Sequence, residues 1–277
     1  MTQPESFPSF DRNLAIERCR SLRLRCLEIS QQVSALHIAP AFSCLEIVDA
    51  VYSDLMMKDS SQRSPDTFIL SKGHGFLAQL VVLEAKGVIS REAIDSFCTR
   101  SGSIGVHPDY GTPGITASTG SLGHGLSMGV GIALANRAAT EQAHAGVVYV
   151  VLSDGELQEG STWEAVMLAS SFAIHNLVVF VDNNDFQSLG RTSETHPSLY
   201  PIEEKFRAFG WETASADGHD SQELVHRVRS REANSPYVLI ARTTKGKGVS
   251  YMENEPIWHY RSPNESEYRL AVAELGG

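Results

Sequence analysis

Two short apolar runs dominate the pattern of hydrophobic and polar positions, and about the length of one helix separates them. The runs lie at 147–152 and 177–181 and are rich in β-branched residues, and the segment between them has a helical pattern. Continuous apolar runs of this length are typical of strands that are buried on both faces of a parallel sheet. The pattern therefore predicts a strand–helix–strand unit in an α/β fold, with a mostly parallel sheet and helices on both faces.

Periodicity elsewhere predicts the remaining elements. Further strands are expected at 67–70, after 210 and at 237–241. Helices are expected from 11, from about 43, through 81–83, over 126–137 and over 221–231, with a short one within 188–210 and none after 263. Residues 1–10 carry two prolines and little pattern, which favours a flexible arm, and 11–277 are expected to form a single domain.

Polar residues follow both central strands. Asp154 and Gly155 end the first strand, and Asn184 follows the second strand thirty positions later. Because neighbouring parallel strands end at the same edge of a sheet, these residues are expected side by side. The Asp and Asn side-chain oxygens, with the backbone carbonyl of Phe186, suit one Mg²⁺ that also binds phosphate oxygens; Ca²⁺ or Mn²⁺ are alternatives. Gly155 lets the backbone approach a phosphate at a helix start, so a metal-bound diphosphate is predicted.

The alternative interpretation is that both segments are ordinary polar turns, in which Asp, Asn, Gly and Ser are common. Their regular spacing across a strand–helix–strand unit favours the binding site.

Composition limits the partners and the compartment. The chain has 277 residues, a formal charge of −10 and no basic cluster, which argues against nucleic acid and anionic membranes as partners. Four cysteines without metal-ligand spacing are predicted to be buried free thiols, which suits a cytoplasmic protein. Neither a signal peptide nor a membrane span is predicted.

Two motifs resemble the transketolase family. These are Ser71-Lys-Gly-His74 and the run from Asp154 to Ala165, Asp-Gly-Glu-Leu-Gln-Glu-Gly-Ser-Thr-Trp-Glu-Ala, although Ser153 stands where the family usually has Gly. The resemblance covers nearly all of 11–262. It implies the thiamine-diphosphate-binding fold, with thiamine diphosphate and Mg²⁺ as cofactors.

The resemblance also assigns roles to individual residues. At the cofactor it places Lys72, His74, Gly120, Ser121, Leu122, Gly155, Glu156, Asn184, Lys245 and His259. Imidazoles suit proton transfer near neutral pH, so the catalytic candidates are His37, His74, His107 and His259. Glu159 matches a carboxylate that bonds across a dimer interface to the partner's catalytic Glu. By the residues alone, favourable placement near a helix start explains Glu159 equally well. His124 has no assigned role.

Two departures from the family pattern leave the identity of the sugar substrate undetermined. Leu36 replaces the usual Gly, and Pro40 stands where many relatives have a small hydroxyl residue near the cofactor.

The Glu that activates the cofactor in transketolases is not found in this chain, because it lies in a second, pyrimidine-binding domain. The resemblance therefore implies the N-terminal subunit of a split transketolase, in an α₂β₂ assembly with a C-terminal subunit that carries that domain. Such an enzyme transfers a two-carbon ketol unit from a ketose phosphate to an aldose phosphate, and basic residues for the sugar phosphate would lie on the partner.

Several alternatives share parts of this pattern. A deoxyxylulose-phosphate-synthase-like enzyme, a two-chain 2-oxoacid dehydrogenase and a two-carbon transferase of secondary metabolism would share the metal motif. A non-catalytic stabilising subunit would keep only the fold. A dinucleotide-binding domain is disfavoured, because no Gly-x-Gly-x-x-Gly follows a first strand.

Overall fold

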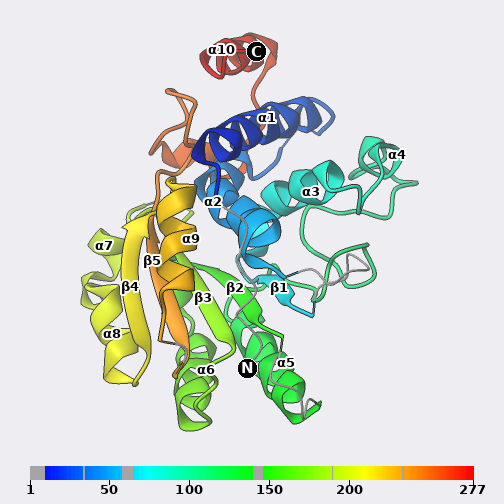
Figure 1. The fold of residues 1–277 in the computed structure, drawn as a ribbon. Coiled ribbons are helices and arrows are strands. Elements are labelled where there is room, and N and C mark those ends of the chain that lie inside the picture. Colours follow the sequence, from blue (N-terminus) through cyan, green and yellow to red (C-terminus); the bar gives the residue numbers. More distant parts are fainter. Residues whose placement is uncertain (1–9, 34, 58–64, 140–145, 189, 233) are drawn as a thin grey trace.

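The computed structural model describes residues 10–33, 35–57, 65–139, 146–188, 190–232 and 234–277. At its centre lies a five-stranded sheet in the order β1-β2-β3-β5-β4, in which every neighbouring pair is parallel (Figure 1). The strands are β1 Thr67–Leu70, β2 Val148–Ser153, β3 Leu177–Asn183, β4 Glu212–Asp217 and β5 Tyr237–Arg242. The predicted parallel α/β sheet is therefore confirmed.

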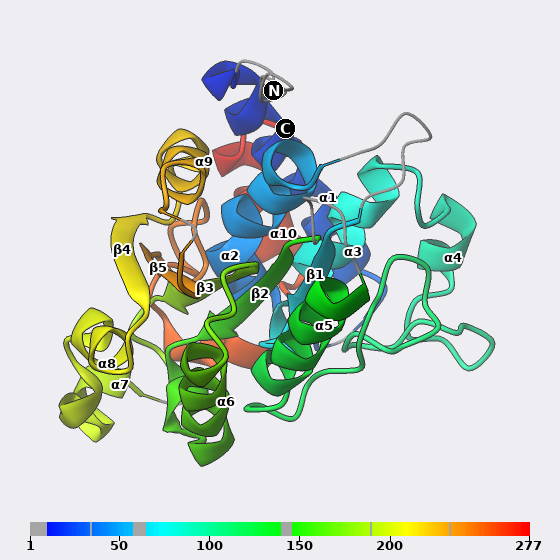
Figure 2. The same cartoon turned by 60° about the horizontal axis from the view of Figure 1, so that its bottom comes forward.

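Helices cover both faces of the sheet, as predicted, and the two layers separate clearly in Figures 1 and 2. One layer contains α1 Arg12–Ser30, α2 Ile38–Ala50, α3 Phe76–Ala85 and α9 Ser221–Arg229, with α10 Glu265–Glu274 against α1. The other contains α5 Gly125–Ala139, α6 Gly160–Ser171 and α8 Ile202–Ala208. Shorter elements are α4 Arg91–Asp95, α7 Thr192–Thr195, a π-helical turn Val51–Leu55, and 3₁₀ turns Gly73–Gly75, Gly155–Gln158, Pro197–Leu199 and Pro256–Tyr260.

The central strands β2 and β3 are apolar up to their carboxyl ends because both of their faces are buried. Successive side chains of a strand point to opposite faces. Val178 and Phe180 of β3 accordingly join the core under α1, α2 and α3, whereas Val179 and Val181 join the core under α5, α6 and α8. This double burial leaves the carboxyl ends of the strands as the place where polar groups can gather.

Two helix predictions were wrong. The second helix begins at Ile38 rather than near Ser43, because Pro40 sits in its first turn. Backbone N–H groups of a first turn have no partner within the helix, so a proline there breaks no hydrogen bond. The segment after Pro263 also forms a helix, α10. Asn264 and Glu267 make a reciprocal capping box at its start, a signature that the sequence already carries.

The cysteine prediction holds only in part. All four thiols are free, and Cys19, Cys26 and Cys44 are buried, but Cys98 is exposed. Cys98 lies just after the short helix α4, in the left-handed region at φ 56°.

The predicted arm over 1–10 lies outside the described residues except for Phe10, whose partly buried side chain packs against the core. No helix in the described ranges is both long enough and apolar enough to span a bilayer.

Candidate active site

The exits of β2 and β3 meet at one edge of the sheet. Ser153 pairs with Asp182 in the register of the two strands. Beyond them, the Asp154 carboxylate accepts a hydrogen bond of 2.6 Å from the backbone N–H of Asp185. Asp154 and Asn184 are 1% and 8% exposed, so both polar side chains are withdrawn from solvent at this edge. The structure thus brings together the two residues that the sequence paired.

The chemistry of these oxygens fits a hard cation. Burial, and next the neighbouring Asp182, raise the pKa of Asp154 to about 7, so a divalent cation here would offset an unfavourable buried charge. The Asn184 amide donates from Nδ2 to Ser43 Oγ at 2.9 Å, and its Oδ1 accepts from the Phe186 N–H at 2.8 Å. Among the described residues no group of three His, Cys, Asp or Glu is placed to hold a metal. A metal at Asp154 would therefore complete its shell with amide, backbone and phosphate oxygens.

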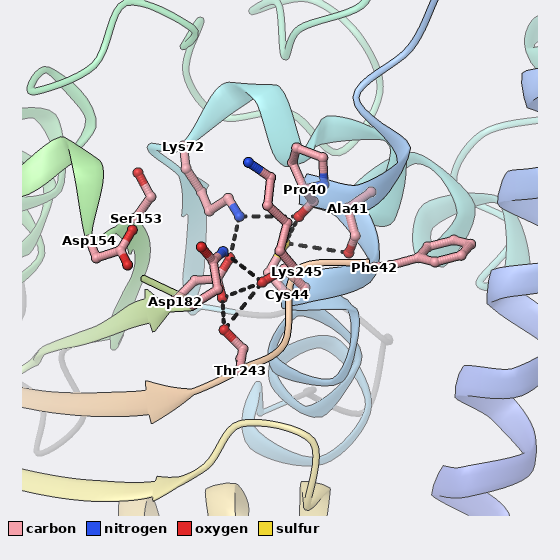
Figure 3. A network of polar contacts seen from close by, with 12 residues as sticks. Pro40, Ala41, Phe42, Cys44, Lys72, Ser153, Asp154, Asp182, Thr243 and Lys245 are labelled. Carbon is pink, nitrogen blue, oxygen red and sulfur yellow. Dashed lines mark hydrogen bonds and ion pairs between the residues drawn. The ribbon is translucent and has the colours of Figure 1, made fainter. Parts of the chain in front are cut away.

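A closed polar network lies beside these groups (Figure 3). Lys72 forms an ion pair with Asp182 and donates to the Pro40 carbonyl at 3.1 Å. Ser43 Oγ donates to Asp182 Oδ1 at 2.7 Å, and the Thr243 hydroxyl donates to the same oxygen. Sequence reasoning missed Asp182, Ser43 and Thr243, although Asp182 stands directly in the Asp-Asn-Asn run at the strand exit.

Four predicted histidines surround one cavity. The ring centroid of His37 lies 5.9 Å from that of His74, 5.7 Å from His107 and 5.3 Å from His259. The cavity measures about 320 Å³, and its lining is His37, His74, His107, Gly120, Leu122, Ser153, Gly155, Gln158, Glu159, Phe186, Gln187, Ser188 and His259. These histidines come from four separate segments, so only the tertiary fold joins them.

Three of these imidazoles, those of His37, His74 and His259, are held neutral. Burial first, and then neighbouring cationic groups, lower the pKa of His37 to about 4 and that of His259 to about 3. The same causes place the pKa of His74 well below its usual value, with Lys72 as the largest charge contribution. Neutral imidazoles can accept protons at pH 7, which suits general base chemistry.

Lys245 adds uncompensated positive character. Its Nζ lies 2.9 Å from His259 Nδ1 and 3.1 Å from the Gln187 carbonyl oxygen. Within the part of the chain that the structure describes, Lys245 forms no ion pair with a carboxylate. Burial, and next Lys72, lower its pKa to about 8. A bound anion would relieve this desolvation, so the electrostatics favour an anionic ligand.

Two glycine-containing loops approach each other at the cavity wall. A Cβ on Gly73 would lie 2.6 Å from the Gly120 backbone nitrogen, and Gly120 has φ +138°. The His107 ring packs against Gly120. Glycine is therefore required on both sides of this contact, for close approach at Gly73 and for conformation at Gly120.

Other predicted residues occupy different positions. Glu156 is fully buried and accepts from the Ser71 hydroxyl and from the Gly123 N–H, so its carboxylate joins two loops and does not line the cavity. Ser121 is exposed and lines a neighbouring hollow together with His124. Glu159 is exposed at the cavity and occupies the N-cap position of α6 without a capping hydrogen bond.

Comparison with known proteins decides the family. A family model described as "Transketolase, thiamine diphosphate binding domain" matches residues 13–276. The chain belongs to the transketolase family. Its fold also superposes on transketolase from Campylobacter jejuni with a TM-score of 0.87 at 24% identity, covering 96% of this chain and 43% of that one.

Relatives of similar length are named as separate subunits. One of the subunits of the apulose-4-phosphate transketolase of Phocaeicola vulgatus is 40% identical over 258 residues, which is 91% of this chain and 90% of the relative. "6-deoxy-6-sulfo-D-fructose transketolase subunit SqwG" of a Clostridium species is 36% identical over 261 residues, 92% and 93% of the two chains. Human transketolase is 30% identical, but the matched region spans only 38% of that protein. This transketolase-family chain thus corresponds to the thiamine-diphosphate-binding domain and, in extent, to relatives that are named as single subunits.

Proposed function

We propose that this chain is the diphosphate-binding subunit of a two-chain transketolase. With thiamine diphosphate and Mg²⁺ the assembled enzyme transfers a two-carbon ketol unit from a ketose to an aldose. The observation that carries the proposal is the cavity at the strand edge, where four histidines stand next to the paired exits of Asp154 and Asn184. Residues 11–277 would act together as one diphosphate-binding domain.

The donor set suits the two cofactors. Mg²⁺ would be held by the side chains of Asp154 and Asn184 and by the Phe186 carbonyl. The cofactor would be held by Lys72, His74, Lys245 and His259 and by the backbone near Gly120, Leu122 and Gly155. Bound thiamine diphosphate supplies a nucleophilic carbon that adds to a ketone and then an electron sink for the two-carbon fragment.

The chain's own residues supply proton transfer around the substrate. His37 and His259 are neutral at pH 7 because burial lowers their pKa values, so each can accept a proton from a sugar hydroxyl. His107 shares this cavity with His37, at 5.7 Å between ring centroids. The ring centroid of His74 lies 5.5 Å from that of His259, and both rings line the cavity.

The cavity wall indicates what a partner subunit must add. Of the described residues that line it, Glu159 is the sole carboxylate, and none is Lys or Arg. A phosphate or sulfonate on the far end of a sugar would therefore be recognised by the partner. The exposed Glu159 side chain caps no backbone N–H of α6, which leaves its carboxylate available to bond to a partner's catalytic Glu in an α₂β₂ assembly.

The names of the relatives narrow the substrate class. Two relatives are named as subunits of transketolases for apulose-4-phosphate and for 6-deoxy-6-sulfo-D-fructose. We therefore expect the donor to be a ketose that carries an anionic group away from its carbonyl.

Reconstitution with the pyrimidine-domain subunit tests the proposal. Calorimetry of the complex should show saturable binding of thiamine diphosphate with Mg²⁺, and Asp154→Ala should abolish it. Mass spectrometry with ketose phosphates and ketose sulfonates should then detect ketol transfer, with pyruvate as the control donor. Binding that Asp154→Ala leaves unchanged would overturn the site, and binding without any transfer would favour a non-catalytic subunit.

Glu159→Gln offers a separate test of the shared interface. Because the side chain makes no capping bond, the thermal midpoint of the chain should not change. Transfer activity of the complex should fall. Equal activity of the unmodified and the Glu159→Gln complexes would contradict the interface role and favour the alternative, that Glu159 only interacts favourably with the start of α6.

A further inference from the structure

Two neighbouring loops leave the sheet after β4 and β5, and they are pressed against each other. Asp217 pairs with Arg242 at the strand ends, and the Gly218 N–H donates to the Arg242 carbonyl at 2.7 Å. A Cβ on Gly218 would lie 2.3 Å from Thr243 Cγ2. The loop after β4 therefore buttresses the loop after β5, which carries Lys245.

The imidazole of His219 bridges from this loop in two directions. Its Nδ1 lies 2.9 Å from Glu46 Oε2, and its Nε2 lies 2.8 Å from the backbone nitrogen of Thr244. A backbone N–H can only donate, so Nε2 carries the lone pair and Nδ1 carries the proton that is donated to Glu46. The two contacts together select one neutral tautomer.

Glu46 is itself held in place from α1. Arg23 pairs with it at 2.6 Å, and the two side chains are 7% and 8% exposed. Burial alone would raise the pKa of Glu46, but Arg23 and the bond from His219 bring it down to about 2. Glu46 is therefore a fixed anion that accepts from His219 across the pH range in which the enzyme would work.

The bond from the Thr244 backbone to His219 bears on the proposed diphosphate site through Lys245. Thr244 directly precedes Lys245, and on the other side the Gly246 N–H donates to the Ala39 carbonyl at 3.1 Å. Lys245 is thus anchored at both neighbours, by His219 at one and by α2 at the other. Neither His219 nor Glu46 lines the histidine cavity, so any effect on a ligand there must pass through this loop.

We propose that His219 is a positioning residue, which fixes the Thr244 backbone in one orientation and thereby places the Lys245 ammonium for the diphosphate. The inference rests on the proposed function, because Lys245 matters only if that anion binds there.

A matched pair of substitutions separates the two bonds of the imidazole. The amide oxygen of Gln reaches the place of Nε2, so His219→Gln keeps an acceptor for Thr244. The amide of Asn reaches only the place of Nδ1, so His219→Asn keeps a donor for Glu46 and loses Thr244. In the reconstituted complex with Mg²⁺, calorimetry should show thiamine diphosphate binding about tenfold weaker for His219→Asn, the size of one lost hydrogen bond. His219→Gln should bind as the unmodified chain does.

Equal binding by the two variants, or weaker binding by His219→Gln, would overturn the proposal. Each variant loses one bond, so similar thermal midpoints with different affinities exclude a merely structural role. His226→Asn, the same change at an exposed histidine of α9, is the control and should alter neither quantity.

A second measurement on the chain needs no cofactor. Nitrogen-15 NMR should find the proton of His219 on Nδ1, and hydrogen exchange of the Thr244 amide should quicken in His219→Asn but not in His219→Gln. A proton on Nε2 would overturn the inference. If the unmodified complex binds no thiamine diphosphate, the proposed function fails, whereas these NMR results still decide the role of His219 in holding the loop.

Discussion

The ammonium of Lys72 and the carboxylate of Asp182 form an ion pair that is closed to solvent, with side chains 1% and 0% exposed. Three further contacts complete it, from the Pro40 carbonyl and from the hydroxyls of Ser43 and Thr243. Removal of one charge from such a pair leaves the other buried without compensation. The pair therefore links the stability of the fold to Lys72, one of the residues proposed to hold the cofactor.

Lys72→Met tests this link. The free energy of unfolding should fall by about 3–5 kcal/mol, because Asp182 would stay buried and unpaired. Urea denaturation followed by circular dichroism measures the change. Lys247→Met is the control: its contact with Glu253 spans 3.8 Å at a half-exposed surface, so a loss of about 0–1 kcal/mol is expected. Equal losses in both variants would contradict the prediction.

Ser43→Ala should weaken the metal site without removing a ligand. The Ser43 hydroxyl donates to Asp182 and accepts from Asn184 Nδ2, which keeps the amide oxygen of Asn184 turned away from Ser43. Loss of a partner that orients a ligand typically weakens metal affinity by about 10–100-fold. Titration of the complex with Mn²⁺, read by electron paramagnetic resonance, measures the affinity. Ser53→Ala, which removes a hydroxyl bonded to Asp49, should leave it unchanged.

Gly73→Ala should separate the two loops at the cavity wall. The new methyl group would lie 2.6 Å from the Gly120 nitrogen and 2.8 Å from the Gly120 Cα, and backbone atoms cannot rotate away. Overpacking of this kind costs about 1–3 kcal/mol in stability. Gly131→Ala in α5 meets nothing within 4 Å, so it should stabilise the helix by up to about 1 kcal/mol. Thermal unfolding of both variants gives the comparison, and a stable Gly73→Ala chain would refute the close contact.

The histidine cavity should make the unliganded chain sensitive to acid. The pKa values of His37 and His259 are lowered to about 4 and about 3 by burial and then by nearby cationic groups. An unfolded chain takes up these protons near pH 6.5, whereas the folded chain resists them. Stability from these groups is therefore complete above about pH 6.5 and is lost as the pH falls toward 4.

Thermal unfolding between pH 7.5 and pH 4 measures this effect. His37→Gln and His259→Gln should each flatten the decline, because they remove a group that titrates differently in the two states. An unchanged slope in both variants would show that groups other than His37 and His259 cause the acid sensitivity.

Much of the fold could be predicted because short, local patterns of residues specify it. The apolar runs of β2 and β3 identify strands that are buried on both faces, and the polar residues directly after them mark the edge at which a ligand binds. The helix α10 was missed although its capping box is local, because its large apolar residues stand at every second position, 268, 270 and 272, and not at helical spacing. The start of α2 was misplaced because a proline reads as a break wherever its position in the helix is unknown.

The sequence by itself determined the class of fold, the two strand exits and the family motifs, because each depends on residues close together in the chain. The tertiary structure alone decided which distant groups meet. Ser43 bonds to Asp182 across 139 positions, and His219 lies against Glu46 across 173 positions. Such contacts follow from the packing of α2 against the sheet and the loops, and no local pattern specifies them. For that reason the residues predicted to contact the ligand could be identified from the sequence. The residues that orient them, such as Ser43 and His219, could be identified only from the tertiary structure.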